Sequence, residues 1–376
     1  MKLHVSDYLS PRSFLLLILA TVSCLLMWDS PGVRALGEPA SDPNVDLFLL
    51  GLEEPGEVRA ASTLTSSVKL SELHPTGDGD PIADAAFWEE DPPAVRFGHS
   101  LVYDSDRERL VVFGGLDGEN LSNKTWVSTE KPAPEWEKLS SLPPDPIDYT
   151  VADSVRRPSP RAGQAMVLIP DRSQILVIGG YGATGPRSDV WALDLATRSD
   201  DWTSVTVESE NAGQEFPDPR SGHTAIYDPV GRRVILFGGT AGNLDFLDDT
   251  WVLDLEAAPA SWSELNLDSP AGPSARVGHT AVYDAMGHRM LVFGGLGEQL
   301  ELLDDTWELS LTGEPDGWKW KRIHPSGNDQ LPSARARHAA IFDAKHNRML
   351  VFAGVDENSE LNDLWELSFD RSASWT

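Results

Sequence analysis

The sequence predicts an all-β repeat protein in which several four-stranded sheets are arranged around a common axis. The 376 residues include 31 Gly, 27 Pro and 13 Trp, which indicates many turns and a recurring aromatic position. One sequence pattern recurs five times between residues 93 and 376, and each copy fits four short strands. A single four-stranded sheet cannot bury both of its faces, whereas copies placed around an axis can. We call each copy a blade.

Charge and cysteine content exclude several classes of function. The chain has 30 Lys and Arg against 59 Asp and Glu, a formal charge of −29, and one cysteine. Nucleic-acid binding needs a basic surface that neutralises phosphates, so we expect no nucleic-acid partner. One cysteine allows neither an intrachain disulfide nor a Cys-rich zinc site.

Residues 1–37 differ in composition from the rest of the chain. Two basic residues precede an apolar run at 14–28, which is short for a membrane span and typical of a signal-peptide core. Small residues at Ala35 and Gly37 suit cleavage. We therefore expect a signal peptide and a secreted or extracytoplasmic protein, with no stable membrane span after cleavage. An uncleaved N-terminal membrane anchor is the alternative.

The first half of each blade begins with an arginine. These arginines are Arg96, Arg161, Arg220, Arg276 and Arg335. In the copy RSGHTAIYDPVGRRVILFGG, the segment HTAIYD alternates small and large side chains, as an inner strand does. RVILF is continuously apolar, which favours a strand buried on both faces, and we expect the glycine pair to end it in a tight turn.

The second half of each blade carries an aromatic strand such as DDTWVLDL. Its tryptophans are Trp126, Trp191, Trp251, Trp307 and Trp365. A second tryptophan closes each unit, so ten of the 13 tryptophans occupy these two positions. The predicted blades span 93–140, 158–206, 217–266, 273–324 and 332–376, and the last lacks its final strand.

The Arg-x-Gly-His motif, the paired glycines and the Asp-x-Trp strand resemble kelch repeats, the blades of kelch-type β-propellers such as the central domain of galactose oxidase. The resemblance covers about residues 93–375. Three positions depart from the pattern, because Gln164 replaces the histidine, Arg337 replaces the glycine and Ala353 replaces the first glycine of its pair. The resemblance implies a kelch β-propeller over residues 38–376.

Two segments of the chain, one at each end, do not fit five whole blades. Residues 44–75 resemble the third and fourth strands of a blade, so the sequence favours a six-bladed ring closed by strands from both chain ends. The natural polypeptide would then continue beyond Thr376. A five-bladed ring in which residues 66–74 supply an outer strand is the alternative, and a seven-bladed ring remains open.

Repeated polar residues are interpreted as structural rather than catalytic. The histidines His99, His223, His279 and His338 could form a metal-binding ring, but Gln164 interrupts the set. A residue present in nearly every blade is expected to have a structural role that all blades share, such as a hydrogen bond to a buried backbone group. We expect no metal site. We expect the repeated arginines to form salt bridges or hydrogen bonds with loops of neighbouring blades, with the Asp-x-Trp aspartates as candidate partners.

The sequence contains no identifiable catalytic residues. The galactose oxidase family requires a cysteine crosslinked to a tyrosine, and no cysteine follows residue 37. No Gly-x-Ser-x-Gly, Walker or HExxH motif is present. A non-enzymatic role is favoured, while a sugar-active enzyme related to epimerases or oxidases remains the alternative.

Acidic loops on one face are the candidate binding site. The loops between second and third strands (116–124, 181–188, 240–249, 296–305 and 355–363) hold thirteen acidic and two basic residues. The binding candidates are Asp245, Asp248, Asp249, Glu298, Asp304, Asp305, Asp356 and Asp363, together with Tyr149 in the long connection 137–160. They favour a protein or glycan partner. Ca²⁺ is an open alternative to having no cofactor, and a solvated acidic rim is the alternative to any site. The oligomeric state is not indicated.

Overall fold

The computed structural model describes residue 93 and residues 96–118, 120–128, 135–139, 157–197, 200–209, 216–265, 272–325, 331–369 and 373–376. The signal peptide, the partial blade at 44–75 and Tyr149 lie outside these residues. Within the described ranges, no helix is long and apolar enough to cross a membrane.

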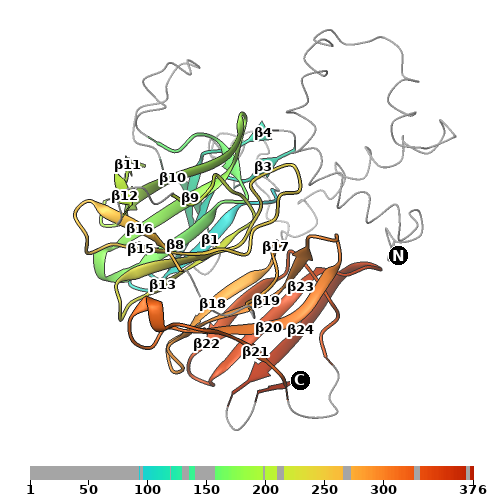
Figure 1. Ribbon diagram of the computed structural model, residues 1–376. Helices are drawn as coiled ribbons and strands as arrows, with labels where there is room; N and C mark the ends of the chain where they lie inside the picture. The colour runs from blue at the N-terminus through green and yellow to red at the C-terminus, as the bar shows by residue number, and fades with distance from the viewer. Residues whose placement is uncertain are drawn as a thin grey trace, which may run out of the picture. The chain divides into compact units, whose positions relative to one another are not determined.

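The described residues form five sheets that follow one another along the chain, which confirms the all-β propeller (Figure 1). Each sheet contains four antiparallel strands in sequence order. The first blade comprises β1 (Ser100–Asp104), β2 (Arg109–Phe113), β5 (Thr125–Ser128) and β6 (Trp136–Lys138). The second comprises β8 (Ala165–Ile169), β9 (Gln174–Gly182), β10 (Gly185–Asp194) and β11 (Trp202–Ser204). The third comprises β13 (Thr224–Asp228), β14 (Arg233–Phe237), β15 (Thr250–Asp254) and β16 (Ala260–Glu264).

The last two blades repeat this order. The fourth comprises β18 (Thr280–Asp284), β19 (Arg289–Gly297), β20 (Leu302–Ser310) and β21 (Trp320–Ile323). The fifth comprises β22 (Ala339–Asp343), β23 (Arg348–Val355), β24 (Glu360–Ser368) and β25 (Ser374–Trp375). The sequence predicts that the fifth blade lacks its last strand, whereas β25 pairs with β24, so a short fourth strand is present.

Short elements decorate this frame. β3 (Leu116–Asp117) and β4 (Asn120–Leu121) form a hairpin in the first blade. β7 (Arg161–Ala162) and β17 (Arg276–Val277) pair with β9 and β19. Single 3₁₀ turns occur at Pro170–Arg172 and Pro315–Gly317. β12 (Val207–Ser209), which sequence reasoning missed, leaves the second blade and pairs in parallel with β16 of the third.

The hydrophobic core lies between the blades. The inner strands β1, β8, β13, β18 and β22 are neighbours in that order. One face of each blade packs on the opposite face of the next, as where Ile235 and Phe237 of the third blade meet Val292 of the fourth. Because all three side chains are completely buried, removing them from water stabilises the contact between blades by about 2 kcal/mol each.

The glycine pairs end the second strand in some blades only. In the first and third blades, β2 and β14 end directly before the pair, at Phe113 and Phe237, as the sequence predicts. In the second blade, β9 runs through Gly179 and Gly180, which have φ angles of 58° and 98°. The backbone bulges there, and Gly180 N–H donates a hydrogen bond of 2.8 Å to the carbonyl of Arg220 in the next blade. A Cβ on Gly180 would lie 2.8 Å from the Gln164 Cβ, so this approach requires glycine. The motif is therefore a contact between blades.

A second set of backbone bonds links the starts of the inner strands. The third residue of each Arg-x-Gly-His motif has a left-handed conformation, and its N–H donates to the equivalent carbonyl of the preceding blade. The bonds run from Gly163 to Gly98, Gly222 to Gly163, Gly278 to Gly222 and Arg337 to Gly278, at 2.8–3.0 Å. Arg337 keeps this conformation (φ 57°) although it has a side chain. The departure from glycine does not interrupt the series.

The outward face of the fifth blade is exposed. Phe352 has 51% of its surface accessible, whereas the equivalent Phe293 and Phe237 have 0%. Leu364, its cross-strand partner, is 61% accessible, and Ile341 on the same face is 62% accessible. This is the face on which a following blade would pack. The described residues contain five blades, and the predicted sixth involves residues outside them.

Candidate functional site

A buried arginine, an aspartate and a tryptophan form one unit in four of the five blades. In the third blade, Arg220 donates through Nη1 and Nη2 to the two carboxylate oxygens of Asp249, at 2.5 and 2.6 Å. Trp251 Nε1 donates to the same carboxylate at 2.6 Å. The equivalent pairs are Arg161–Asp189, Arg276–Asp305 and Arg335–Asp363.

This unit ties the start of a blade to its second and third strands. Arg276 is completely buried, and its Nη1 also donates to the carbonyl of Gly294, at 3.0 Å. Burial alone would raise the pKa of Asp305, but hydrogen bonds from Arg276 and Trp307 outweigh it and hold this pKa below its ordinary value. The carboxylate is thus ionised at neutral pH and neutralises a buried guanidinium.

The first blade lacks this carboxylate because Lys124 occupies the position of Asp249. Arg96 still donates to the carbonyl of Gly114, at 3.0 Å. The buried Nε1 of Trp126 has no hydrogen-bond partner among the described residues. The indole N–H, which donates to an aspartate in the other four blades, therefore has no acceptor among the described residues of the first blade.

Two of the repeated histidines, His279 and His338, connect their blade to the preceding one. His279 Nε2 lies 2.8 Å from Thr224 Oγ1 of the preceding blade, and His338 Nε2 lies 2.8 Å from Thr280 Oγ1. Burial lowers the pKa of His338 to about 3, with Arg335 adding to the effect, and burial also lowers the pKa of His223 to about 3. His99 in the first blade is exposed. The described part of the chain holds no group of three His, Cys, Asp or Glu residues arranged to bind a metal.

The acidic binding candidates divide into three groups. Asp249, Asp305 and Asp363 are held by buried arginines, so their charge is satisfied within the blade. Asp356 accepts hydrogen bonds from the backbone of its own turn, at Asn358 and Ser359. The exposed carboxylates that remain are those of Asp245, Asp248, Glu298 and Asp304. We call segments 240–249, 296–305 and 355–363 the acidic loops.

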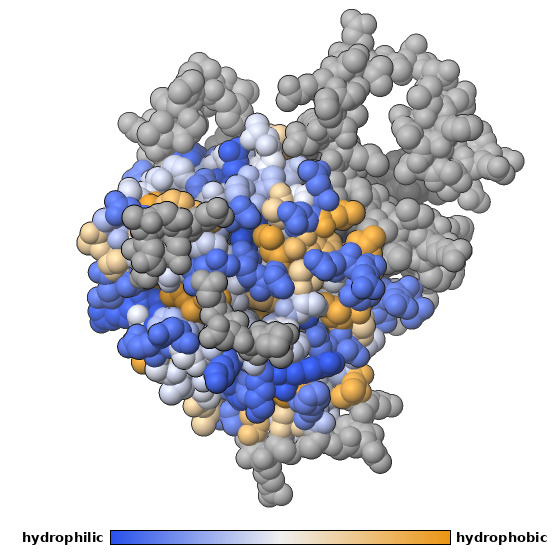
Figure 2. Space-filling model, viewed as in Figure 1, coloured by the Kyte–Doolittle hydropathy of each residue, from blue (hydrophilic) through white to orange (hydrophobic). Residues whose placement is uncertain are grey.

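Polar side chains dominate much of the visible surface of the propeller, and apolar patches interrupt them (Figure 2). Near the long connection 137–160, Arg157 Nη1 lies 3.7 Å from Asp200 Oδ2. The buried Asp200 carboxylate also accepts hydrogen bonds from Thr125 and Trp202, at 2.6 and 2.8 Å. Arg157 therefore pairs with the second blade, while Tyr149 and Arg156 lie outside the described residues.

Sequence reasoning missed an ion pair at the hairpin that joins the first two strands. Asp228 at the end of β13 accepts a hydrogen bond of 3.1 Å from Arg233 Nε at the start of β14. The same pair recurs as Asp104–Arg109, Asp284–Arg289 and Asp343–Arg348. The constant spacing of five residues between aspartate and arginine could have revealed it. The second blade has Ile169 and Gln174 at these positions.

Comparison with known families agrees with this architecture. The family described as the KLHDC2/KLHL20/DRC7 Kelch-repeats domain matches residues 149–272 and 259–376. Together the two matches cover the second to the fifth blades, where the arginine, aspartate and tryptophan unit is complete.

Curated relatives carry the same repeats. The chain is 32% identical over 284 residues to the F-box/kelch-repeat protein At1g51550 of Arabidopsis thaliana, covering 70% of this chain and 55% of that protein. It is 28% identical over 254 residues to Adagio-like protein 3 of Oryza sativa subsp. japonica, covering 65% of this chain and 36% of that protein. The chain thus spans about half or less of the length of these relatives. The family match and the repeated geometry establish that this chain belongs to the kelch-repeat proteins.

Proposed function

We propose that this propeller is an exported interaction module that binds a protein partner through its acidic loops. Kelch β-propellers generally serve as protein-interaction modules. The observation that carries the choice of face is the exposure of Asp248, Glu298 and Asp304 on consecutive blades. These carboxylates differ from Asp249 and Asp305 beside them, whose charge is used inside the fold.

Electrostatics favours a partner with a basic surface. The formal charge of the chain is −29, so its field attracts cationic groups at long range and repels acidic ones. Charges on loop tips are solvated, and they therefore act mainly on the association rate and on partner choice. Loops held by rigid blades also limit the conformational entropy that binding costs.

Affinity capture with matched variants tests the proposal. The triple variant D248N/E298Q/D304N neutralises three exposed carboxylates of the acidic loops. The control D106N/E314Q/D316N neutralises three exposed carboxylates in turns at the opposite ends of the strands. We expect a partner captured by the wild type to be retained by the control and lost by the first variant. Equal capture by both variants would contradict the proposal, and a glycan array run in parallel would detect a carbohydrate partner instead.

The proposal of export depends on residues 1–37. Their short apolar run and the small residues after it are typical of a signal peptide. Expression of the full chain followed by N-terminal sequencing tests this. We expect the mature protein outside the membrane, beginning close to residue 38. A membrane-bound product that retains Met1 would instead support an anchor.

A further inference from the structure

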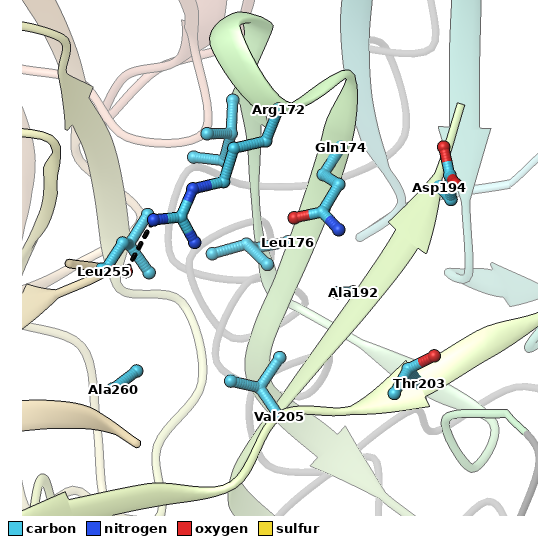
Figure 3. A pocket seen from close by; sticks show the side chains of 10 residues that line it. Arg172, Gln174, Leu176, Ala192, Asp194, Thr203, Val205, Leu255 and Ala260 are labelled. Atoms are coloured by element: carbon cyan, nitrogen blue, oxygen red, sulfur yellow. Dashed lines mark hydrogen bonds between the residues drawn. The ribbon is translucent and has the colours of Figure 1, made fainter. Parts of the chain in front are cut away.

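A pocket of about 330 Å³ lies between the second and third blades (Figure 3). Its lining includes Arg172, Gln174, Leu176 and Val205 of the second blade and Leu255 and Ala260 of the third. Arg172 lies in the turn between β8 and β9 and Gln174 begins β9, at the other end of the strands from the acidic loops. The pocket is therefore separate from the proposed interaction face.

The first cause of the pocket is the loss of the hairpin ion pair from the second blade. In the third blade, Asp228 and Arg233 fill the equivalent position with a salt bridge of 3.1 Å. The second blade has Ile169, which is 1% exposed, and Gln174 instead. The aspartate of the pair is thus replaced by the apolar Ile169, and the arginine by the shorter, uncharged Gln174.

The second cause is Ala260 on the opposing blade. Ala260 precedes the closing Trp262 by two residues, as Trp318 precedes Trp320 in the fourth blade. Trp318 is 2% exposed and packs between the third and fourth blades. The space that an indole fills between those blades is left open between the second and third.

The same propeller shows what fits such a space. Arg233 stacks over the ring of Trp318, with its guanidinium carbon 4.3 Å from the ring centroid. One blade further on, Arg289 stacks over the ring of Phe369 at 4.2 Å. In both places a planar aromatic ring lies between apolar strands and an arginine.

We propose that the pocket binds a single planar aromatic side chain, an indole above all, presented by a partner protein. Leu176, Val205 and Leu255 provide apolar contacts for a ring. Arg172 provides a guanidinium, fixed by hydrogen bonds of 2.5 Å to the Leu255 carbonyl and 2.9 Å to Glu256 Oε1. Figure 3 shows this side chain extending toward Leu255 beside Gln174 and Leu176. The Gln174 carboxamide supplies an acceptor for an indole N–H.

The surroundings of the pocket favour a polypeptide as the source of this ring. Glu256 bonds to Arg172 at 2.9 Å and to Arg232 at 3.4 Å, and Arg232 lies 3.8 Å from Asp171. These groups are one-third to one-half exposed, and they border the apolar pocket with charges of both signs. An apolar pocket that accepts one aromatic anchor inside a polar rim is the anatomy of a protein-interface hot spot. The inference that the ring belongs to a protein rests on the proposed function, whereas the existence of the pocket is independent of it.

Titration of the full chain with N-acetyl-tryptophan amide tests the site directly. We expect methyl chemical-shift changes at Ile169, Leu176 and Leu255, and binding at least about tenfold weaker for N-acetyl-leucine amide. Absence of shifts at these methyls, or equal binding of the two probes, would overturn the proposal. This measurement needs no variant, so it does not depend on how a substitution folds.

Two variants locate the binding and its source. A260W places an indole where Trp318 lies in the next interface and should abolish the shifts, whereas A285W adds a tryptophan in an exposed turn and should leave them unchanged. A peptide library selected on the wild type and depleted on A260W should enrich peptides with one tryptophan or phenylalanine. Selected peptides without a shared aromatic residue would refute a protein source even if the free amide binds. The amide titration and the peptide selection do not involve the acidic loops, so both results would stand even if no partner binds those loops.

Discussion

Gln164 Nε2 donates a hydrogen bond of 3.0 Å to the carbonyl of Phe113, across the contact between the first and second blades. Gln164 occupies the position at which the next three blades have His223, His279 and His338. The glutamine therefore keeps a polar link between blades without an ionisable group. At this position Gln164 and His338 each bond to the preceding blade, and an uncharged side chain is sufficient for that bond.

Replacing His338 by glutamine should make the protein less sensitive to acid. Burial lowers the pKa of His338 to about 3, so the unfolded chain, with an ordinary histidine pKa of about 6.5, binds a proton more readily. Its contribution to stability is thus complete above about pH 6.5 and is lost as the pH falls toward 3. The free energy of unfolding, measured by urea denaturation, should fall less steeply from pH 6.5 to 4 in H338Q.

His324 supplies the control for this experiment because it is exposed. The variant H324Q should follow the wild-type pH dependence. Aspartates held by arginine, such as Asp305, lose their contribution at lower pH, below the ordinary aspartate pKa of about 3.8. An H338Q variant whose slope above pH 4 equals that of the wild type would refute the role given to this histidine.

Introducing an aspartate at Lys124 should stabilise the first blade. Lys124 lies two residues before Trp126, as Asp249 lies two residues before Trp251, and Trp126 Nε1 is buried without a partner among the described residues. K124D would supply the acceptor for this indole N–H. We expect about 1–2 kcal/mol of added stability by chemical denaturation, since a buried unsatisfied donor costs that much. K124Q removes the same positive charge without the carboxylate, and an equal gain in K124Q would contradict this explanation.

Two equivalent phenylalanines should differ in their contribution to stability. Phe293 is completely buried between the fourth and fifth blades, and F293A should cost about 3–5 kcal/mol. Phe352 occupies the same position in the fifth blade but is 51% exposed, so F352A should cost less than about 1.5 kcal/mol. Guanidinium denaturation of the two variants gives this comparison. Equal costs would show that another segment packs on the outward face of the fifth blade.

Filling the pocket should raise stability even without a ligand. A260W restores the aromatic side chain that Trp318 provides in the next interface, and Q174R restores the arginine that stacks on it there. The double variant A260W/Q174R should exceed the sum of the single variants by about 0.5–1 kcal/mol, because the stacking contact requires both residues. Strictly additive effects would show that the two side chains do not meet.

The repeated residues made the fold predictable. Each Arg-x-Gly-His motif and each Asp-x-Trp strand fulfils the same local role in several blades, so the pattern identified the Asp-x-Trp aspartates as candidate partners of the arginines. It placed the contact between blades, whereas Arg220 and Asp249 belong to the same blade. The role of the glycine pair was predicted only in part. β2 and β14 end before the pair as expected, but the N–H of Gly180 bonds to a carbonyl of the next blade, which the pattern did not indicate. A contact between repeats is not visible in the sequence of one repeat.

The pocket could not be predicted for the same reason. It arises from Gln174, which replaces the arginine of the other four copies, together with Ala260 in the next blade. Only the packing of the blades brings these two residues together. The acidic candidates show a second limit of sequence analysis, which could not separate structural from exposed carboxylates. Asp248 and Asp249 are adjacent in sequence, yet only Asp249 is held by a buried arginine.

Hydrogen exchange of the wild type bound to its captured partner tests the central claim most directly. The account predicts that binding protects amides in the acidic loops, 240–249, 296–305 and 355–363. Turns at the opposite ends of the strands, such as 229–232 and 285–288, should exchange as in the free protein. Protection confined to those turns, with the acidic loops unchanged, would contradict the account.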